Sequence, residues 1–159
     1  MELIRTLTQL VNNLRSLGIR RRVAVVCPND PHTEYVIIRS LREEIAEYLL
    51  VTDEAHVEIA HNLRAASPDF VRVYITSTPD EAAALAVELV RTGEADILMK
   101  GLINTDNLLR AVLKKEKGLL PPGGVLSMLP WHRFHCIINY CSFLMRLSFL
   151  VRDCYSFVQ

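Results

Sequence analysis

Short apolar runs alternate with amphipathic stretches through most of this sequence, and that alternation restricts the fold more than any other feature. The runs expected to form strands are residues 21–27, 48–53, 71–77 and 95–101. A stretch with apolar residues at helical spacing follows each run, and this order predicts right-handed crossovers between parallel strands. We therefore expect an α/β fold, a parallel sheet with helices on both faces.

The helices are expected at residues 1–17, 32–47, 54–66, 79–92 and 105–117. The helix at 79–92 has the clearest boundaries. Thr78 is its N-cap, Pro79 its first residue, Glu81 lies three residues after the cap, and Gly93 follows its end. Gly18 and Gly118 are expected to end the first and last helices.

The charge balance favours a small-molecule partner over nucleic acid. Lys+Arg and Asp+Glu both number 18, so the formal net charge is zero, and no basic face stands out. The N-terminus carries Glu2 and Arg5 where a signal peptide would need an apolar core, so we expect a cytoplasmic protein that neither spans nor binds a membrane.

The cysteines and histidines suggest neither disulfides nor a metal. Cys27 stands apart from the other three cysteines, which fits reduced thiols and a buried strand position for Cys27. The histidines at 32, 56 and 61 have no spacing typical of metal ligands. No metal is therefore expected.

Polar residues follow all four expected strands, at 28–30, 52–53, 77–78 and 100–105. In a parallel sheet these loops gather along one edge, where ligands bind. In the last loop, Gly101 permits a tight turn, Asn104 or Thr105 caps the next helix, and Lys100 adds a positive charge to the helix N-terminus. Together these features predict an anion site.

Arg110 lies in the second turn of that helix and offers a planar guanidinium to phosphate if its face turns toward the crevice. Each residue also has a simpler interpretation. A polar residue that opens a helix is often only a cap, a lysine at a strand end is often solvated, and an arginine stem often covers apolar surface. Asp30 and Asp53 are likewise open to interpretation as turn caps.

The string "ADILMKGLINTDNLLRAVLKKEKGL", residues 95–119, resembles the phosphate acetyl/butyryl transferase family, especially its phosphate butyryltransferase branch. The resemblance extends back through "PDEAAALAVELVRTG" to "RRVAVVCPND" and covers about residues 20–127. It implies transfer of an acyl group between acyl-CoA and inorganic phosphate, giving acyl phosphate and CoA. The coenzyme A thioester is a substrate, and no cofactor or metal is implied.

The resemblance also implies an architecture and a set of site residues. Family members resemble isocitrate dehydrogenase, with two α/β domains around a cleft; they are roughly twice this length, and we expect them to be homo-oligomers. Arg110 and Lys100 fall on the family's "MKG…T…LRA" pattern as candidate catalytic residues. Gly101, Asn104 and Thr105 fall there as candidate substrate or phosphate contacts, although the family usually has His near position 104.

Residues 128–159 differ in composition from the rest, with seven of the eleven aromatic residues and only one acidic residue, Asp153. After "VLS" the family would continue with a string such as "HVAVASFPLHHKLL". Back-translating "SMLPWHRFHCIINYC" and reading one nucleotide earlier permits that string. It forces Ala across 131–132, Leu across 135–136 and two Leu across 139–141.

We therefore interpret residues 1–127 as the N-terminal α/β domain of a truncated phosphate acyltransferase and 128–159 as an aberrant tail, frameshifted by one nucleotide lost at Ser127. Two other interpretations of the tail, a membrane span and a zinc site, fit its residues less well. Residues 134–151 are mostly apolar, but Asn139 and Arg146 interrupt any membrane span. His132, His135, Cys136 and Cys141 fit no standard zinc spacing.

Two functional alternatives remain open from the sequence. Asp53, Thr78 and Lys100 each follow a strand, as the residues of a phospho-accepting receiver-like signalling domain would. The chain is also open to interpretation as a non-functional fragment with an exposed apolar face that would promote aggregation.

Overall fold

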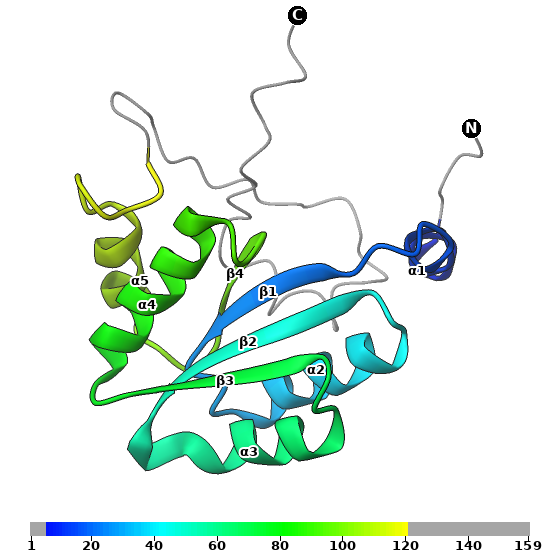
Figure 1. Ribbon diagram of the computed structural model, residues 1–159, viewed down its shortest axis with the longest axis horizontal. Coiled ribbons are helices and arrows are strands. Elements are labelled where there is room, and N and C mark those ends of the chain that lie inside the picture. The colour runs from blue at the N-terminus through cyan, green and yellow to red at the C-terminus, as the bar shows by residue number, and fades with distance from the viewer. Residues whose placement is uncertain (1–5, 121–159) are drawn as a thin grey trace, which may run out of the picture.

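The structure, a computed structural model, describes residues 6–120 as a four-stranded parallel sheet with helices on both faces (Figure 1). The strands are β1 (Arg21–Val26), β2 (Ala46–Asp53), β3 (Val71–Thr76) and β4 (Ile97–Lys100). The helices are α1 (Leu7–Ser16), α2 (Pro31–Arg42), α3 (Val57–Ala66), α4 (Pro79–Thr92) and α5 (Thr105–Val112), with a 3-10 turn, η1 (Glu54–His56), before α3. The α/β fold expected from the sequence is confirmed. The first helix, expected at 1–17, begins only at Leu7, because Thr6 takes an extended conformation and caps it. Residues 1–5 and the tail at 128–159 lie outside the described residues.

The strand order is β3-β2-β1-β4, so the direction of winding reverses at β1. The chain first builds outward from β1 to β3 and then crosses back to place β4 on the other side of β1. Val26, the last residue of β1, is in register with Val51 of β2 and with Lys100 of β4. The carboxyl ends of β1 and β4 therefore flank the switch point, where ligands bind in sheets of this kind.

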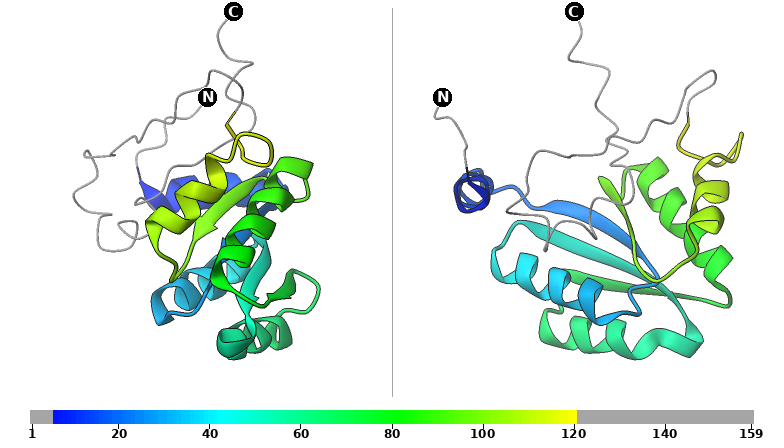
Figure 2. Two further views of the ribbon diagram at one scale, coloured as in Figure 1. Left: turned by 90° about the vertical axis from the view of Figure 1, so that its left-hand side faces the viewer. Right: turned by 180° about the vertical axis from the view of Figure 1, so that it is seen from behind.

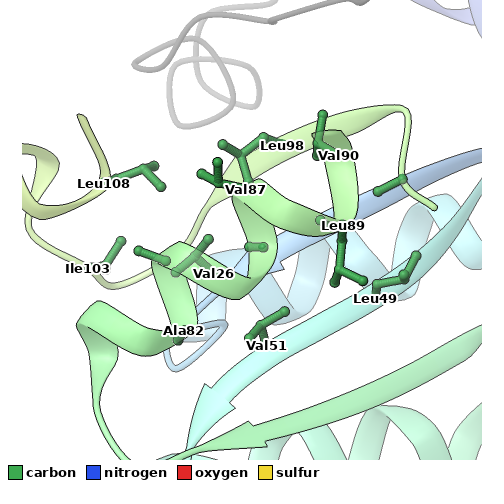
Figure 3. Packing of buried hydrophobic residues seen from close by; sticks show 14 of the residues in the cluster. Val26, Leu49, Val51, Ala82, Val87, Leu89, Val90, Leu98, Ile103 and Leu108 are labelled. Carbon is green, nitrogen blue, oxygen red and sulfur yellow. The ribbon is translucent and has the colours of Figure 1, made fainter. Parts of the chain in front are cut away.

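Helices lie on both faces of the sheet (Figure 2). Beneath them, one apolar layer of side chains packs on each face. Side chains alternate along β1, so that Ala24 and Val26 face α4 and α5 whereas Val23 and Val25 face α2 and α3. Figure 3 shows Val26 packing beneath α4 together with residues of β2. Because both faces of β1 are buried, its residues 23–26 read as a continuous apolar run, whereas the edge strand β3 includes exposed positions.

The boundaries expected for α4 are confirmed. The Thr78 hydroxyl accepts a hydrogen bond from the Glu81 N–H at 3.2 Å, and Gly93 ends the helix with a left-handed φ of 82°. The Glu81 carboxylate accepts from the Ser77 N–H at 3.1 Å, one residue before the cap. Gly18, with a φ of 64°, ends α1 as expected.

The helix expected at 32–47 is too long. The helix ends at Arg42, and Glu44 takes a left-handed φ of 58°. Ala46 and Glu47 already belong to β2, where they are in register with Arg21 and Arg22 of β1. Helical spacing continues past Arg42 in the sequence, but burial of Ala46 between the layers makes the strand the more stable state there.

The helix expected at 105–117 is also too long. It ends at Val112, and the chain folds back so that the Leu119 N–H donates to the Val112 carbonyl at 2.9 Å. Leu119 thereby packs against the core layer beneath α4 and α5. Gly118 therefore lies in this return turn and not at the helix end. Glycine is required there, because a Cβ would meet the carbonyl oxygens of Val112 and Lys114.

Hydrogen bonds hold β1 and β4 together at both ends. At the amino end, Arg22 donates from Nη2 to Asp96 Oδ1 at 3.0 Å and from Nε to Asp96 Oδ2 at 3.3 Å. These bonds lower the pKa of the Asp96 carboxyl. At the carboxyl end, the N–H groups of Gly101 and Leu102 donate to the carbonyls of Val26 and Cys27 at 2.8 and 2.7 Å.

No helix within residues 6–120 combines the length and the apolar character that crossing a membrane requires.

Glycine is the one residue type that fits at position 101, where the backbone lies against the carbonyl groups of Val26 and Cys27. A Cβ built there would lie 2.7 Å from the Val26 carbonyl oxygen and still closer to the Cys27 carbonyl oxygen. We therefore expect Gly101→Ala to lower the free energy of unfolding by about 3 kcal/mol, because the clash is with backbone that cannot rotate away. Urea denaturation measures the change.

Gly18→Ala is the control for this variant. A Cβ at Gly18 meets nothing within 4 Å, so only the left-handed φ of 64° is strained, at about 1 kcal/mol. Equal losses for the two variants would show that contact with the β1 carbonyls is not the constraint at Gly101.

Candidate functional site

The loops that follow β1 and β4 lie side by side at the switch point, joined by the two backbone hydrogen bonds from Gly101 and Leu102. The loop after β2 joins them through a side-chain contact, since the Thr52 hydroxyl donates to Asn29 Oδ1 at 3.1 Å. The end of β3 lies at the same edge, where the Thr76 hydroxyl donates to the Thr52 carbonyl at 3.1 Å. The polar residues that follow the strands therefore gather at the carboxyl edge as expected.

Cys27 has a structural role at this edge. It follows the last residue of β1 with a left-handed φ of 51°, and its N–H donates to the Val51 carbonyl at 2.8 Å. Burial, and then the charge of Asp53, raise the pKa of the thiol to about 11. The thiol is therefore protonated near neutral pH and is a poor nucleophile. The buried position expected for Cys27 is confirmed, although it lies just past the strand.

Lys100 and Asn104 flank the turn between β4 and α5. The half-buried Lys100 side chain bends back so that Nζ donates to the Gly101 carbonyl at 3.3 Å. Asn104 is the N-cap of α5, and its Oδ1 accepts from the Asp106 N–H at 3.1 Å. Of the two caps that the sequence left open, Asn104 is therefore the one used.

Thr105 is the first residue of α5 and is exposed. Its backbone N–H and that of Asn107 find no hydrogen-bond acceptor among residues 6–120, as is usual for the first turn of a helix. These two donors and the Lys100 ammonium border the same short turn. The acidic residue in that first turn, Asp106, adds a negative charge beside them.

Arg110 does not lie in this turn. It belongs to the last turn of α5, about 7.5 Å beyond Thr105 along the helix axis. Leu108 and Val112 form the face of α5 that packs toward α4, and at about 100° per residue Arg110 projects from the opposite face. Its side chain is exposed and makes no ion pair within residues 6–120.

A side-chain hydrogen bond that the sequence does not predict ties α5 to α4. Asn107 Nδ2 donates to Asp80 Oδ1 at 2.7 Å, which joins the first turns of the two helices. The two residues are far apart in the sequence and belong to no motif, so no local signal reveals the bond. It helps to hold the start of α5 where the β4 loop delivers it.

The two aspartates open to interpretation as turn caps differ in the structure. Asp30 caps α2, where Oδ1 accepts from the N–H groups of His32 and Thr33 at 3.1 and 2.9 Å. Asp53 occupies the N-cap position of η1, but its side chain makes no capping hydrogen bond there. Its buried carboxylate pairs with His56, at 2.8 Å between Oδ1 and Nδ1, while the imidazole is largely exposed.

The receiver-like alternative is not favoured. Thr78 follows β3 and Lys100 is the last residue of β4, and these strands form opposite edges of the sheet. Three strand spacings, about 14 Å, separate them, so with Asp53 they cannot surround one phosphoryl group. Among residues 6–120, no three His, Cys, Asp or Glu side chains lie close enough to share a metal ion.

Comparison with known proteins gives partial-length matches to acyltransferases. The chain is 34% identical over 119 residues to phosphate butyryltransferase of Clostridium acetobutylicum, which covers 74% of this chain and 38% of that protein. It is 36% identical over 114 residues to phosphate acetyltransferase of Thermotoga maritima, covering 71% of this chain and 37% of that protein. No protein-family model matches the chain.

One solved structure, a branched-chain phosphotransacylase from Enterococcus faecalis V583, has a TM-score of 0.47 and 23% identity over 59% of this chain and 33% of that chain. This overlap is too loose for positions to be transferred from it.

The sequence matches necessarily include the candidate site. A match that covers 74% of 159 residues extends from residue 42 or earlier to residue 118 or later, wherever it begins. It therefore contains β4, the turn at Gly101 and all of α5. The chain spans about two fifths of the length of these relatives. It is thus a partial-length relative of the phosphate acetyl- and butyryltransferases.

Proposed function

We propose that this chain is part of a phosphate acyltransferase of the phosphate butyryltransferase type. In the reaction, a phosphate oxygen attacks the thioester carbonyl of acyl-CoA, the carbon–sulfur bond breaks, and acyl phosphate and CoA are released. The observation that carries the proposal is the 34–36% identity to enzymes with these names over about seven tenths of the chain. No cofactor or metal takes part in this proposal.

The turn after β4 is the proposed phosphate site. The Lys100 ammonium supplies positive charge, and the first-turn N–H groups of α5 supply hydrogen-bond donors. Gly101 lets the loop backbone lie close against the end of β1, which sets where the turn begins. Asn104 and Thr105 complete the contacts as the cap and first residue of the helix. Because Asp106 places a carboxylate at the same helix end, the site needs a further cation to hold a dianion.

Arg110 is the proposed source of that cation. A guanidinium binds two phosphate oxygens at once, and this positions the attacking oxygen and offsets charge that develops in the transition state. Since Arg110 projects from the face of α5 opposite α4, the phosphate it holds lies outside the two helices. We assign Arg110 and Lys100 as catalytic and Gly101, Asn104 and Thr105 as phosphate or substrate contacts.

The remaining length of the relatives is proposed to supply the opposite wall of the site. This chain spans about two fifths of those proteins, so we expect it to be inactive alone. We also infer that the protein acts in the cytoplasm and that full-length members form homo-oligomers.

We further propose that residues 128–159 are translated out of frame after loss of one nucleotide at Ser127. The change in composition at Met128 and the forced codons support this interpretation. Resequencing the locus is expected to reveal the missing nucleotide and a downstream reading frame that resembles the relatives. An intact gene that ends at Gln159, with no related coding sequence after it, would contradict the proposal.

The activity is tested by thiol release from butyryl-CoA in the presence of phosphate. This chain alone is expected to release no CoA above background. The product of a gene with the frame restored is expected to be active, because it includes the opposite wall. Equal activity of both proteins would show that the part of the relatives beyond this chain is not needed for catalysis. Inactivity of the restored enzyme with acetyl-CoA as well as butyryl-CoA would refute the function.

Arg110→Lys in the frame-restored enzyme tests the phosphate site. We expect kcat/KM for phosphate to fall about 100-fold, because lysine keeps the charge but loses the two-pronged contact. Arg64→Lys is the matched control, since Arg64 is an exposed arginine in the last turn of α3. Its kinetics should equal those of the parent enzyme. If both variants change kcat/KM for phosphate by a similar small amount, Arg110 does not bind the phosphate.

A further inference from the structure

Leu102 is the most exposed large apolar side chain among residues 6–120, at 64%. It lies in the turn between β4 and α5, where both of its neighbours have structural roles. Gly101 contacts the end of β1, and Ile103 is buried in the layer beneath α4 and α5. A single exposed leucine is ordinary on a protein surface, so exposure by itself assigns Leu102 no role. Its position beside the proposed phosphate site does.

The backbone holds this leucine out of the core. The Leu102 N–H donates to the Cys27 carbonyl at 2.7 Å, and the Gly101 N–H before it donates to the Val26 carbonyl at 2.8 Å. On the other side, Ile103 anchors the chain in the core layer. Because both neighbours and its own peptide are fixed in this way, the Leu102 side chain stays at the surface of the turn.

The cation of the proposed phosphate site lies beside Leu102. Lys100 Nζ donates to the Gly101 carbonyl oxygen at 3.3 Å, and that oxygen belongs to the peptide bond that joins Gly101 to Leu102. In a trans peptide, this oxygen lies about 2.8 Å from the following Cα. The ammonium is therefore within about 6 Å of the Leu102 Cα. An anion bound to Lys100 lies within reach of the leucine side chain.

An acyl phosphate has a charged part and an apolar part, and this turn offers a contact to each. The carbonyl carbon of the acyl group is bonded to a phosphate oxygen, so the alkyl chain begins next to the bound phosphate. Contact with leucine removes the chain from water, and each methylene that is fully buried strengthens binding about fourfold. A butyryl group has two methylenes to bury, whereas an acetyl group has none.

We propose that Leu102 contacts the acyl chain and favours butyryl and other longer acyl groups over acetyl. This assignment rests on the proposed acyltransferase function and adds a residue that sets its acyl selectivity. The sequence comparisons leave that selectivity open, because the identity is 34% to the butyryltransferase and 36% to the acetyltransferase.

Competition between butyryl-CoA and acetyl-CoA in the frame-restored enzyme tests the role of Leu102. In Leu102→Ala, we expect the ratio of kcat/KM for butyryl-CoA to kcat/KM for acetyl-CoA to fall about fivefold, because the two methylenes lose one apolar wall. The KM for phosphate should stay at the parent value. Leu102→Met keeps an apolar side chain of similar volume, so it should keep the parent's ratio.

Leu113→Ala is the matched control. Leu113 is also exposed, at 45%, but it follows the opposite end of α5, about 12 Å beyond Thr105 along the helix axis. Its truncation should leave the ratio unchanged. Both alanine variants are expected to keep the parent's unfolding midpoint, because both side chains are exposed.

An unchanged ratio in Leu102→Ala would overturn the assignment, as would an equal change in Leu113→Ala. A loss of activity toward both thioesters by the same factor would also overturn it, since Leu102 would then support the fold and not the acyl chain. A parent enzyme that is inactive toward both thioesters would instead refute the acyltransferase function, and the assignment with it.

Discussion

The rest of the structure depends on the backbone contact between the ends of β1 and β4. Two N–H groups, of Gly101 and Leu102, donate to the carbonyls of Val26 and Cys27 as the fourth strand ends. The absence of a side chain at Gly101 permits this approach. Because the winding of the sheet reverses here, the same contact closes the fold and aligns the loops that border the proposed phosphate site.

Two side-chain hydrogen bonds hold the neighbouring loop and helix beside the joined ends of β1 and β4. Thr52 bonds to Asn29 and joins the β2 loop to the β1 loop, while Asn107 bonds to Asp80 and joins α5 to α4. The start of α5 is therefore fixed from two sides, by the β4 loop and by α4. A helix N-terminus held in this way keeps its donors in place for an anion without reorganisation, which is the physical requirement for electrostatic catalysis.

The sequence pattern predicted elements well where local and tertiary preferences agree. The caps of α4 at Thr78 and Gly93 are set by neighbouring residues and are confirmed. The ends of α2 and α5 were extended too far, because pairing of Ala46 with β1 and the return of Leu119 to the core override helical spacing. At the candidate site, the turn from Lys100 to Thr105 follows from its residues, but the outward face of Arg110 does not.

The sequence by itself determined the α/β class, the order of its elements and the turn at Gly101, because strand and helix periodicities and glycine's small size are local properties. It also carried the similarity to phosphate acetyl- and butyryltransferases. Only the tertiary structure decided which loops are neighbours, that Asn104 rather than Thr105 caps α5, that the pKa of the Cys27 thiol is raised, and that Leu10, Leu14 and Leu17 are exposed. These properties arise from contacts between segments distant in the chain, which no local pattern encodes.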